Sequence, residues 1–109
     1  MKLTENKCEA CRADAPKVTD KEKKSFINEI DNWIIITIDG IEQLYKKFTF
    51  RNYIEAVKFS NKIADLAEAE GHHPKVVTEW GKVEVFWWSH EIKGLHKNDF
   101  ICAAKTDKI

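Results

Sequence analysis

The chain has 109 residues, which suits one domain with its own hydrophobic core and is too short for two. Its 18 lysine and arginine residues balance 18 aspartate and glutamate residues, so no net positive charge favours nucleic acid or an anionic membrane. The longest apolar run, WIIITI, is far shorter than a transmembrane helix, and the polar N-terminus lacks the apolar segment of a signal peptide. We therefore expect a cytoplasmic protein with no direct nucleic-acid or membrane partner.

The first residues lack hydrophobic periodicity, so we predict an N-terminal tail over residues 1–18 and one domain over residues 19–109. The three cysteines form an odd set, which does not indicate a secreted disulfide framework. Cys8 and Cys11 have the C-x-x-C spacing of zinc ligands, but a structural zinc site needs two more ligands and the chain has no second pair. No role for the tail follows from the sequence.

A short helix is predicted over about residues 20–30. Thr19 is a candidate N-cap with Glu22 three residues later, as in a capping box, and an apolar stripe follows. A β-hairpin comes next. Its first strand, in NWIIITI, is rich in β-branched residues, Asp39-Gly40 is a turn signal, and IEQLYKKFTF alternates apolar and polar side chains.

The second helix is predicted to begin after Asn52, a good N-cap, and to end at Gly71, with Pro74 preventing its continuation. Between these limits apolar residues recur at steps of three and four. VVTEW and KVEVFWWS flank a glycine and are predicted to form two more strands. The remainder, HKNDFICAAKTDKI, is predicted to be a last helix with Asp99 in its first turn, where a carboxylate suits the helix dipole.

This order of elements, α-β-β-α-β-β-α, predicts an α+β fold. Tight turns between the strands imply antiparallel pairing in a four-stranded sheet. Three amphipathic helices can then cover one face of the sheet. The other face is left to solvent or to a partner.

Three histidines converge in this predicted fold. His72 and His73 lie in the loop after the second helix, and the last hairpin returns His90 to the same side. Histidine titrates near neutral pH and can donate or accept a proton, which indicates acid–base catalysis. Half-buried structural histidines and a zinc site remain as alternatives. Adjacent residues in extended backbone point to opposite sides, so His72 and His73 are poorly placed to share one metal ion, and no metal or other cofactor is predicted.

Other reactive side chains give weaker signals. Cys102 lies beside two alanines in the last helix and is predicted to be a packing residue. Ser89 has no nucleophile-elbow motif around it, and His96 is expected to be a surface or capping residue. The chain also has four tryptophans, Trp33, Trp80, Trp87 and Trp88. These are many large rings for a small sheet, so we expect one or more of them to stack on a flat heterocycle.

The chain from about Asp31 to the C-terminal helix resembles the pterin-4a-carbinolamine dehydratase family. The resemblance is carried by NW at the first strand, by YKKFTFRNY before the second helix, and by a set of single positions. These positions are Glu68, His72, His73, Pro74, Trp80, His90, Glu91 and Asp99. The chain departs from the pattern at Gly71, where members often carry Asp or Asn.

The resemblance implies a lyase that dehydrates 4a-hydroxytetrahydropterin to quinonoid dihydropterin in tetrahydrobiopterin biosynthesis and recycling, without metal or other cofactor. It implies that His72 and His90 are the acid–base pair and that His73, as the third catalytic histidine, positions the substrate. It further implies that Gly71, Ser89 and Glu91 flank the pterin, that Trp33 or Trp88 stacks on it, and that Glu68 and Asp99 support the site.

The resemblance also implies a homodimer, or a homotetramer of paired dimers, with a functional link to an aromatic amino-acid hydroxylase. An open sheet face with exposed edge strands agrees with pairing between copies. Members of the family also act as dimerisation partners of a transcription factor, and related domains act as assembly chaperones. A dimeric binding module, either a transcriptional coactivator or an assembly chaperone, is therefore the alternative function. The intact histidines favour the enzyme, because a binding module would not need them.

Overall fold

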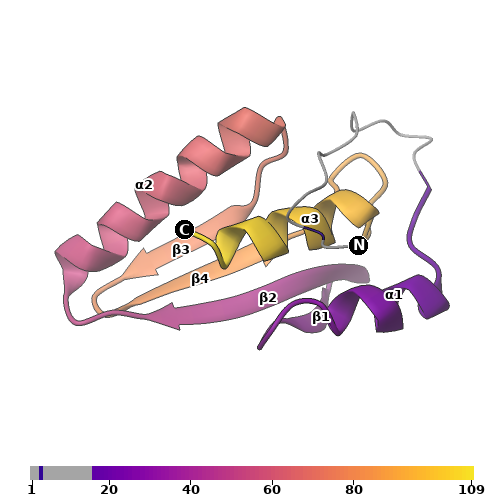
Figure 1. Cartoon of the computed structure of the whole chain (residues 1–109), viewed down its shortest axis with the longest axis horizontal. Coiled ribbons are helices and arrows are strands. Elements are labelled where there is room, and N and C mark those ends of the chain that lie inside the picture. Colours follow the sequence, from indigo (N-terminus) through magenta and orange to yellow (C-terminus); the bar gives the residue numbers. More distant parts are fainter. Residues whose placement is uncertain (1–2, 4–15) are drawn as a thin grey trace.

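The computed structural model describes Leu3 and residues 16–109. Its elements are, in chain order, α1 (Asp20–Ile27), β1 (Ile34–Ile38), β2 (Ile41–Thr49), α2 (Tyr53–Glu70), β3 (Lys75–Glu79), β4 (Lys82–Trp87) and α3 (Lys97–Thr106). The strands form one antiparallel sheet in the order β1-β2-β4-β3, and the helices lie on one side of it (Figure 1). The predicted α+β class and order of elements are confirmed.

The helix ends follow the capping signals in the sequence. At the start of α1, the Thr19 hydroxyl accepts a hydrogen bond from the Glu22 N–H at 3.1 Å, and the Glu22 carboxylate accepts one from the Thr19 N–H at 2.9 Å. At the start of α2, the Asn52 side chain accepts one from the Glu55 N–H at 2.9 Å. Gly71 ends α2 with φ +62°, a left-handed conformation that glycine adopts without steric cost.

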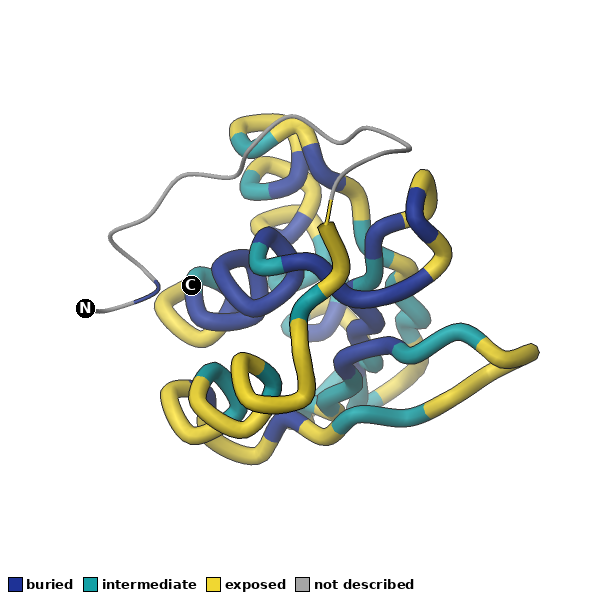
Figure 2. The backbone as a smooth tube through the Cα atoms, turned by 90° about the vertical axis from the view of Figure 1, so that its right-hand side faces the viewer, coloured by how far each residue is buried: buried dark blue, intermediate teal, exposed yellow. Residues whose placement is uncertain are grey.

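The core lies between the sheet and the helices. Leu44 pairs with Trp87, and Phe48 pairs with Val83, in the register of β2 with β4. Leu44, Val83 and Trp87 are fully buried under the helices. The last helix, α3, is buried along most of its length (Figure 2). Polar side chains on α3 must therefore find hydrogen-bond partners inside the protein.

The sheet face opposite the helices carries exposed apolar side chains. Ile34 and Ile38 on β1 are exposed. On the same face the ring of Tyr45 packs against Phe86 at 5.0 Å between centroids, and the Tyr45 hydroxyl donates to Glu84 at 2.6 Å.

None of the helices in the described part of the chain combines the length and apolar character needed to cross a membrane.

The predicted tail falls mostly outside the described residues, and so do Cys8 and Cys11. Leu3 is buried and belongs to the hydrophobic core. The backbone N–H of Val18 donates to the Leu95 carbonyl at 3.0 Å. The parts of the tail that the structure describes therefore contact the domain.

Candidate active site

The loop after α2 and the segment after β4 form the walls of a pocket of about 330 Å³. It is lined by Gly71, His72, His73, His90 and Glu91. The structure thus brings together the three histidines singled out in the sequence. The volume lies at the lower end of the roughly 300–1,000 Å³ typical of small-molecule sites.

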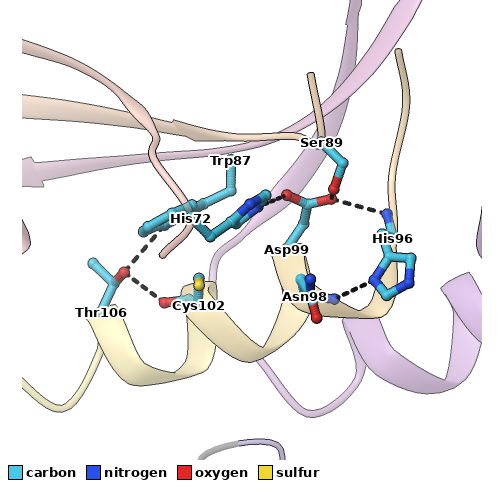
Figure 3. Close-up of polar contacts among 8 residues, drawn as sticks. All are labelled: His72, Trp87, Ser89, His96, Asn98, Asp99, Cys102 and Thr106. Atoms are coloured by element: carbon cyan, nitrogen blue, oxygen red, sulfur yellow. Dashed lines mark hydrogen bonds and ion pairs between the residues drawn. The ribbon is translucent and has the colours of Figure 1, made fainter. Parts of the chain in front are cut away.

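His72 is the most enclosed of the three histidines, with 3% of its surface exposed. The left-handed turn at Gly71 leads directly into it, and its backbone N–H donates to the Ala67 carbonyl at 3.2 Å, continuing the helix cap. Its Nε2 lies 2.7 Å from Oδ1 of Asp99, and its ring stacks on Trp87 with 5.6 Å between centroids (Figure 3). The imidazole is therefore held at one edge and on one face.

Asp99 is the centre of the buried polar network in Figure 3. Its side chain is fully buried, and Oδ2 accepts hydrogen bonds from the Ser89 hydroxyl and the His96 N–H, both at 2.9 Å. Its place in the first turn of α3 favours a negative charge, because the backbone N–H groups there are aligned. A carboxylate oxygen that faces an imidazole nitrogen accepts its N–H, so this contact assigns a hydrogen to Nε2 of His72.

His73 lies in a different environment from its neighbour. Its side chain is 63% exposed, and its Nε2 lies 2.5 Å from Oε2 of Glu68, which is itself exposed on α2. A contact between two exposed side chains contributes little to stability. Pro74 restricts the backbone of His73 to an extended conformation, and the contact with Glu68 lies at Nε2 of its imidazole.

The three residues after β4 divide between the outside and the inside of the protein: Trp88 and His90 pack together, and Ser89 turns inward. The ring of Trp88 packs against the ring of His90 at 4.3 Å between centroids. Ser89 turns inward to bond Asp99, and its N–H also donates to the Gly94 carbonyl at 2.9 Å. This bridge between Ser89 and Gly94 closes the intervening loop and places His90, which is exposed, on the pocket wall.

Trp33 does not line this pocket. It is buried, its indole N–H donates to Oδ2 of Asp107 at 3.0 Å, and its ring packs edge-on against Phe48 at 6.0 Å between centroids. His96 is the N-cap of α3, one of the two places predicted for it, and its Nδ1 accepts from the Asn98 N–H at 3.0 Å. The surface position also predicted for His96 is wrong, because the N-terminus of α3 lies inside the protein and the cap is buried with it.

Two residues that support His72 from the protein interior, Trp87 and Thr106, were not predicted from the sequence to do so. Alternation along β4 places Trp87 on the core side, but it does not reveal that a histidine from a distant loop stacks on it. Thr106, which accepts a hydrogen bond from the Trp87 indole at 3.1 Å, stands in a polar last turn with no distinguishing pattern. The apolar periodicity of the last helix, extended as far as Thr106, could have predicted that this residue lies on the buried face.

The functional groups in and around the pocket are imidazoles and carboxylates. Among Leu3 and residues 16–109, no group of three or more His, Cys, Asp or Glu side chains is arranged to hold a metal ion. The buried His72 is fixed by a carboxylate, and the exposed His90 is backed by an aromatic ring. Such a pair can accept and donate protons on a bound molecule.

The fold and this pocket define a small α+β protein with a pocket lined by three histidines. The family model for pterin 4 alpha carbinolamine dehydratase matches residues 16–109, so the chain belongs to this family. A protein of Photobacterium profundum named "Putative pterin-4-alpha-carbinolamine dehydratase" is 63% identical over 106 residues, covering 97% of this chain and 95% of that protein. A protein of the same name from Saccharophagus degradans is 57% identical over 107 residues, covering 98% and 95%.

Solved structures share the fold. A transcriptional coactivator/pterin dehydratase from Brucella melitensis matches with a TM-score of 0.76 and 26% identity, covering 85% of this chain and 97% of that one. A pterin dehydratase-like protein identified as a RuBisCO assembly factor in the alpha-carboxysome matches with a TM-score of 0.59 and 22% identity, covering 71% and 87%. The family resemblance seen in the sequence is confirmed.

Proposed function

We propose that the protein is a 4a-hydroxytetrahydropterin dehydratase, a lyase that removes water from the 4a-carbinolamine to give quinonoid dihydropterin. Family membership supports the pterin as substrate. The observation that carries the proposal is the pocket in which His72, His73 and His90 meet, with His72 bonded to the buried carboxylate of Asp99.

The reaction breaks the bond between a ring carbon and its hydroxyl oxygen. The leaving oxygen takes up a proton and departs as water, while a ring nitrogen loses a proton, so no oxidant or cofactor enters the balance. Two imidazoles in opposite protonation states can perform both transfers. In this proposal His72, whose hydrogen is held on Nε2 by Asp99, acts as the base through Nδ1, and the exposed His90 acts as the acid.

The remaining pocket residues orient the pterin. His73, directed by Glu68, positions the substrate, and Gly71 and Glu91 flank it. Ser89 acts through its hydrogen bond to Asp99. Stacking of the pterin on Trp88 stays a prediction, and the ring of Trp88 already packs against His90. Trp33, buried against Asp107, has no contact that supports the same role.

The test follows dehydration of freshly generated 4a-hydroxytetrahydropterin, corrected for its spontaneous breakdown, with circular dichroism of every variant. Replacing His72 or His90 by alanine is expected to lower turnover about 10²- to 10⁴-fold, the usual contribution of a general acid or base. The double variant is expected to lose less than the sum, because the two groups act as a unit. His73→Ala is expected to raise KM more than it lowers kcat. Wild-type rates equal to the spontaneous rate would refute the proposal.

The proposal includes a homodimer or homotetramer that acts in the cytoplasm beside an aromatic amino-acid hydroxylase, the class of enzyme whose reaction supplies the carbinolamine. The alternative binding function rests on how two structural neighbours are described, one as a coactivator and one as an assembly factor. No feature of this pocket favours that alternative. A wild-type protein without dehydratase activity would favour it.

A further inference from the structure

Trp87, whose ring stacks on His72, makes a hydrogen bond that a purely apolar core side chain would not make. Trp87 is fully buried at the end of β4, and its indole N–H donates to Oγ1 of Thr106 at 3.1 Å (Figure 3). The Thr106 hydroxyl in turn donates to the Cys102 carbonyl at 2.7 Å. Leucine or phenylalanine would fill a core position without a polar hydrogen that has to be paired. The tether to Thr106 fixes the plane of the indole as well as filling the volume.

The fixed indole plane faces the imidazole of His72. The two rings are 13° from parallel, with 5.6 Å between their centroids. Asp99 binds His72 at Nε2, and a hydrogen bond at one ring atom does not by itself stop the ring from rotating about that bond. The flat face of Trp87 blocks this rotation. These two contacts act on the imidazole from different directions, and together they favour one direction for Nδ1.

Both contacts depend on one helix. Asp99 lies in the first turn of α3 and binds His72 directly, whereas Thr106 is the last residue of α3 and acts through Trp87. Most residues of α3 are buried, so the helix is a rigid support for both ends of this arrangement. Outer partners of this kind orient a reactive imidazole and contribute to its activity without touching the substrate.

We propose that Trp87, anchored by Thr106, is a positioning residue for His72, so that α3 orients this imidazole at its edge and on its face. The expected effect on turnover rests on the proposed dehydratase function, but the orientation of the ring can be measured without substrate. The neighbouring Trp88 cannot replace Trp87, because it packs on His90 instead.

Three variants separate the effects of the flat indole face, of the hydrogen bond to Thr106 and of the side-chain volume. Trp87→Leu removes the flat face and keeps an apolar side chain, Trp87→Phe keeps a flat face without the N–H, and Thr106→Val removes the hydroxyl with little change of shape. Each is compared with wild type by kcat, by KM and by a crystal structure that shows the plane of the His72 ring. Trp80→Leu is the matched control, because Trp80 is 72% exposed in the turn between β3 and β4.

Trp87→Leu is expected to lower kcat about tenfold with KM within about twofold, and to rotate the His72 ring or split it into several orientations. Trp87→Phe is expected to recover most of kcat and the wild-type ring plane. Thr106→Val is expected to tilt both rings and to lower kcat by a smaller factor, and it carries the test if Trp87→Leu does not fold. Trp80→Leu is expected to change neither quantity.

A folded Trp87→Leu protein that keeps a single wild-type orientation of His72 would overturn the inference, whatever its activity. So would a Thr106→Val protein in which kcat and both ring planes are unchanged. If the wild-type protein shows no dehydratase activity, the proposed function fails, and the ring plane alone decides whether Trp87 positions His72.

Discussion

Replacing Asp99 by asparagine would test the buried network with a side chain of the same shape. Ser89 and the His96 N–H both donate to Oδ2, so the amide oxygen is expected at that position and the amide NH₂ is expected to face His72. An NH₂ group donates and does not accept. Nε2 of His72 must then accept, and its hydrogen moves to Nδ1. The substitution exchanges the roles of the two ring nitrogens.

Turnover and stability should both fall. With the proposed base in the wrong tautomer, the proposed dehydration is expected to lose roughly 10²- to 10⁴-fold in kcat. Asp99 takes part in three hydrogen bonds through its carboxylate, and a charge-assisted bond exceeds a neutral one by roughly 1 kcal/mol. The lost charge at the N-terminus of α3 adds roughly 0.3–1 kcal/mol, while asparagine avoids part of the desolvation cost. The free energy of unfolding should therefore drop by about 2 kcal/mol.

The assay combines kcat for dehydration, urea unfolding, and ¹⁵N NMR of His72 to identify its tautomer. Asp107→Asn is the matched control, because Asp107 lies at the other end of α3 and bonds Trp33 and Lys46. It should lower stability and leave the tautomer of His72 unchanged. A folded Asp99→Asn protein with wild-type turnover and the hydrogen still on Nε2 would refute the reasoning.

Three further predictions concern other parts of the molecule. The hydrogen bond to Glu84, helped by burial and by the charge of Glu84, raises the pKa of Tyr45 from 10.0 to about 12. The stability that this hydrogen bond contributes is fully present below pH 10.0 and is lost as the pH rises to about 12. A tyrosinate absorbance step is therefore expected near pH 12. Tyr45→Phe should abolish this step, and Glu84→Gln should move it to lower pH. If Tyr45→Phe leaves that step in place, the assignment is wrong. Gly71→Ala should lower the free energy of unfolding by about 1 kcal/mol, because alanine is strained at a φ of +62°. A Cβ at this position meets no atom within 4 Å, so no steric clash adds to the backbone strain. An unchanged urea midpoint would contradict this. Sedimentation at micromolar concentration should show a dimer or tetramer, and a pure monomer would count against it.

The sequence by itself determined the elements, because the signals that define them act over a few residues. Thr19 with Glu22, Asn52 and Gly71 mark helix ends through contacts with their own nearby backbone, and all act in the structure as predicted. The two strands predicted on either side of Gly81 likewise form, as β3 and β4. The family pattern rests on residue types at defined spacings, so it is visible in the sequence alone, and with it the gathering of the three histidines.

Only the tertiary structure decided how each of these side chains is held. His72 and Asp99 are 27 positions apart and meet because α3 is buried beside the end of α2, an arrangement no local pattern specifies. The same packing put Trp87, and not Trp33, next to a pocket histidine. Side-chain direction in a loop depends on individual backbone angles and on contacts with distant segments, such as the bridge that turns Ser89 inward and His90 outward. Periodicity carries no information about such angles. The sequence therefore identified the candidate side chains of the site, whereas packing around α3 determined their orientation.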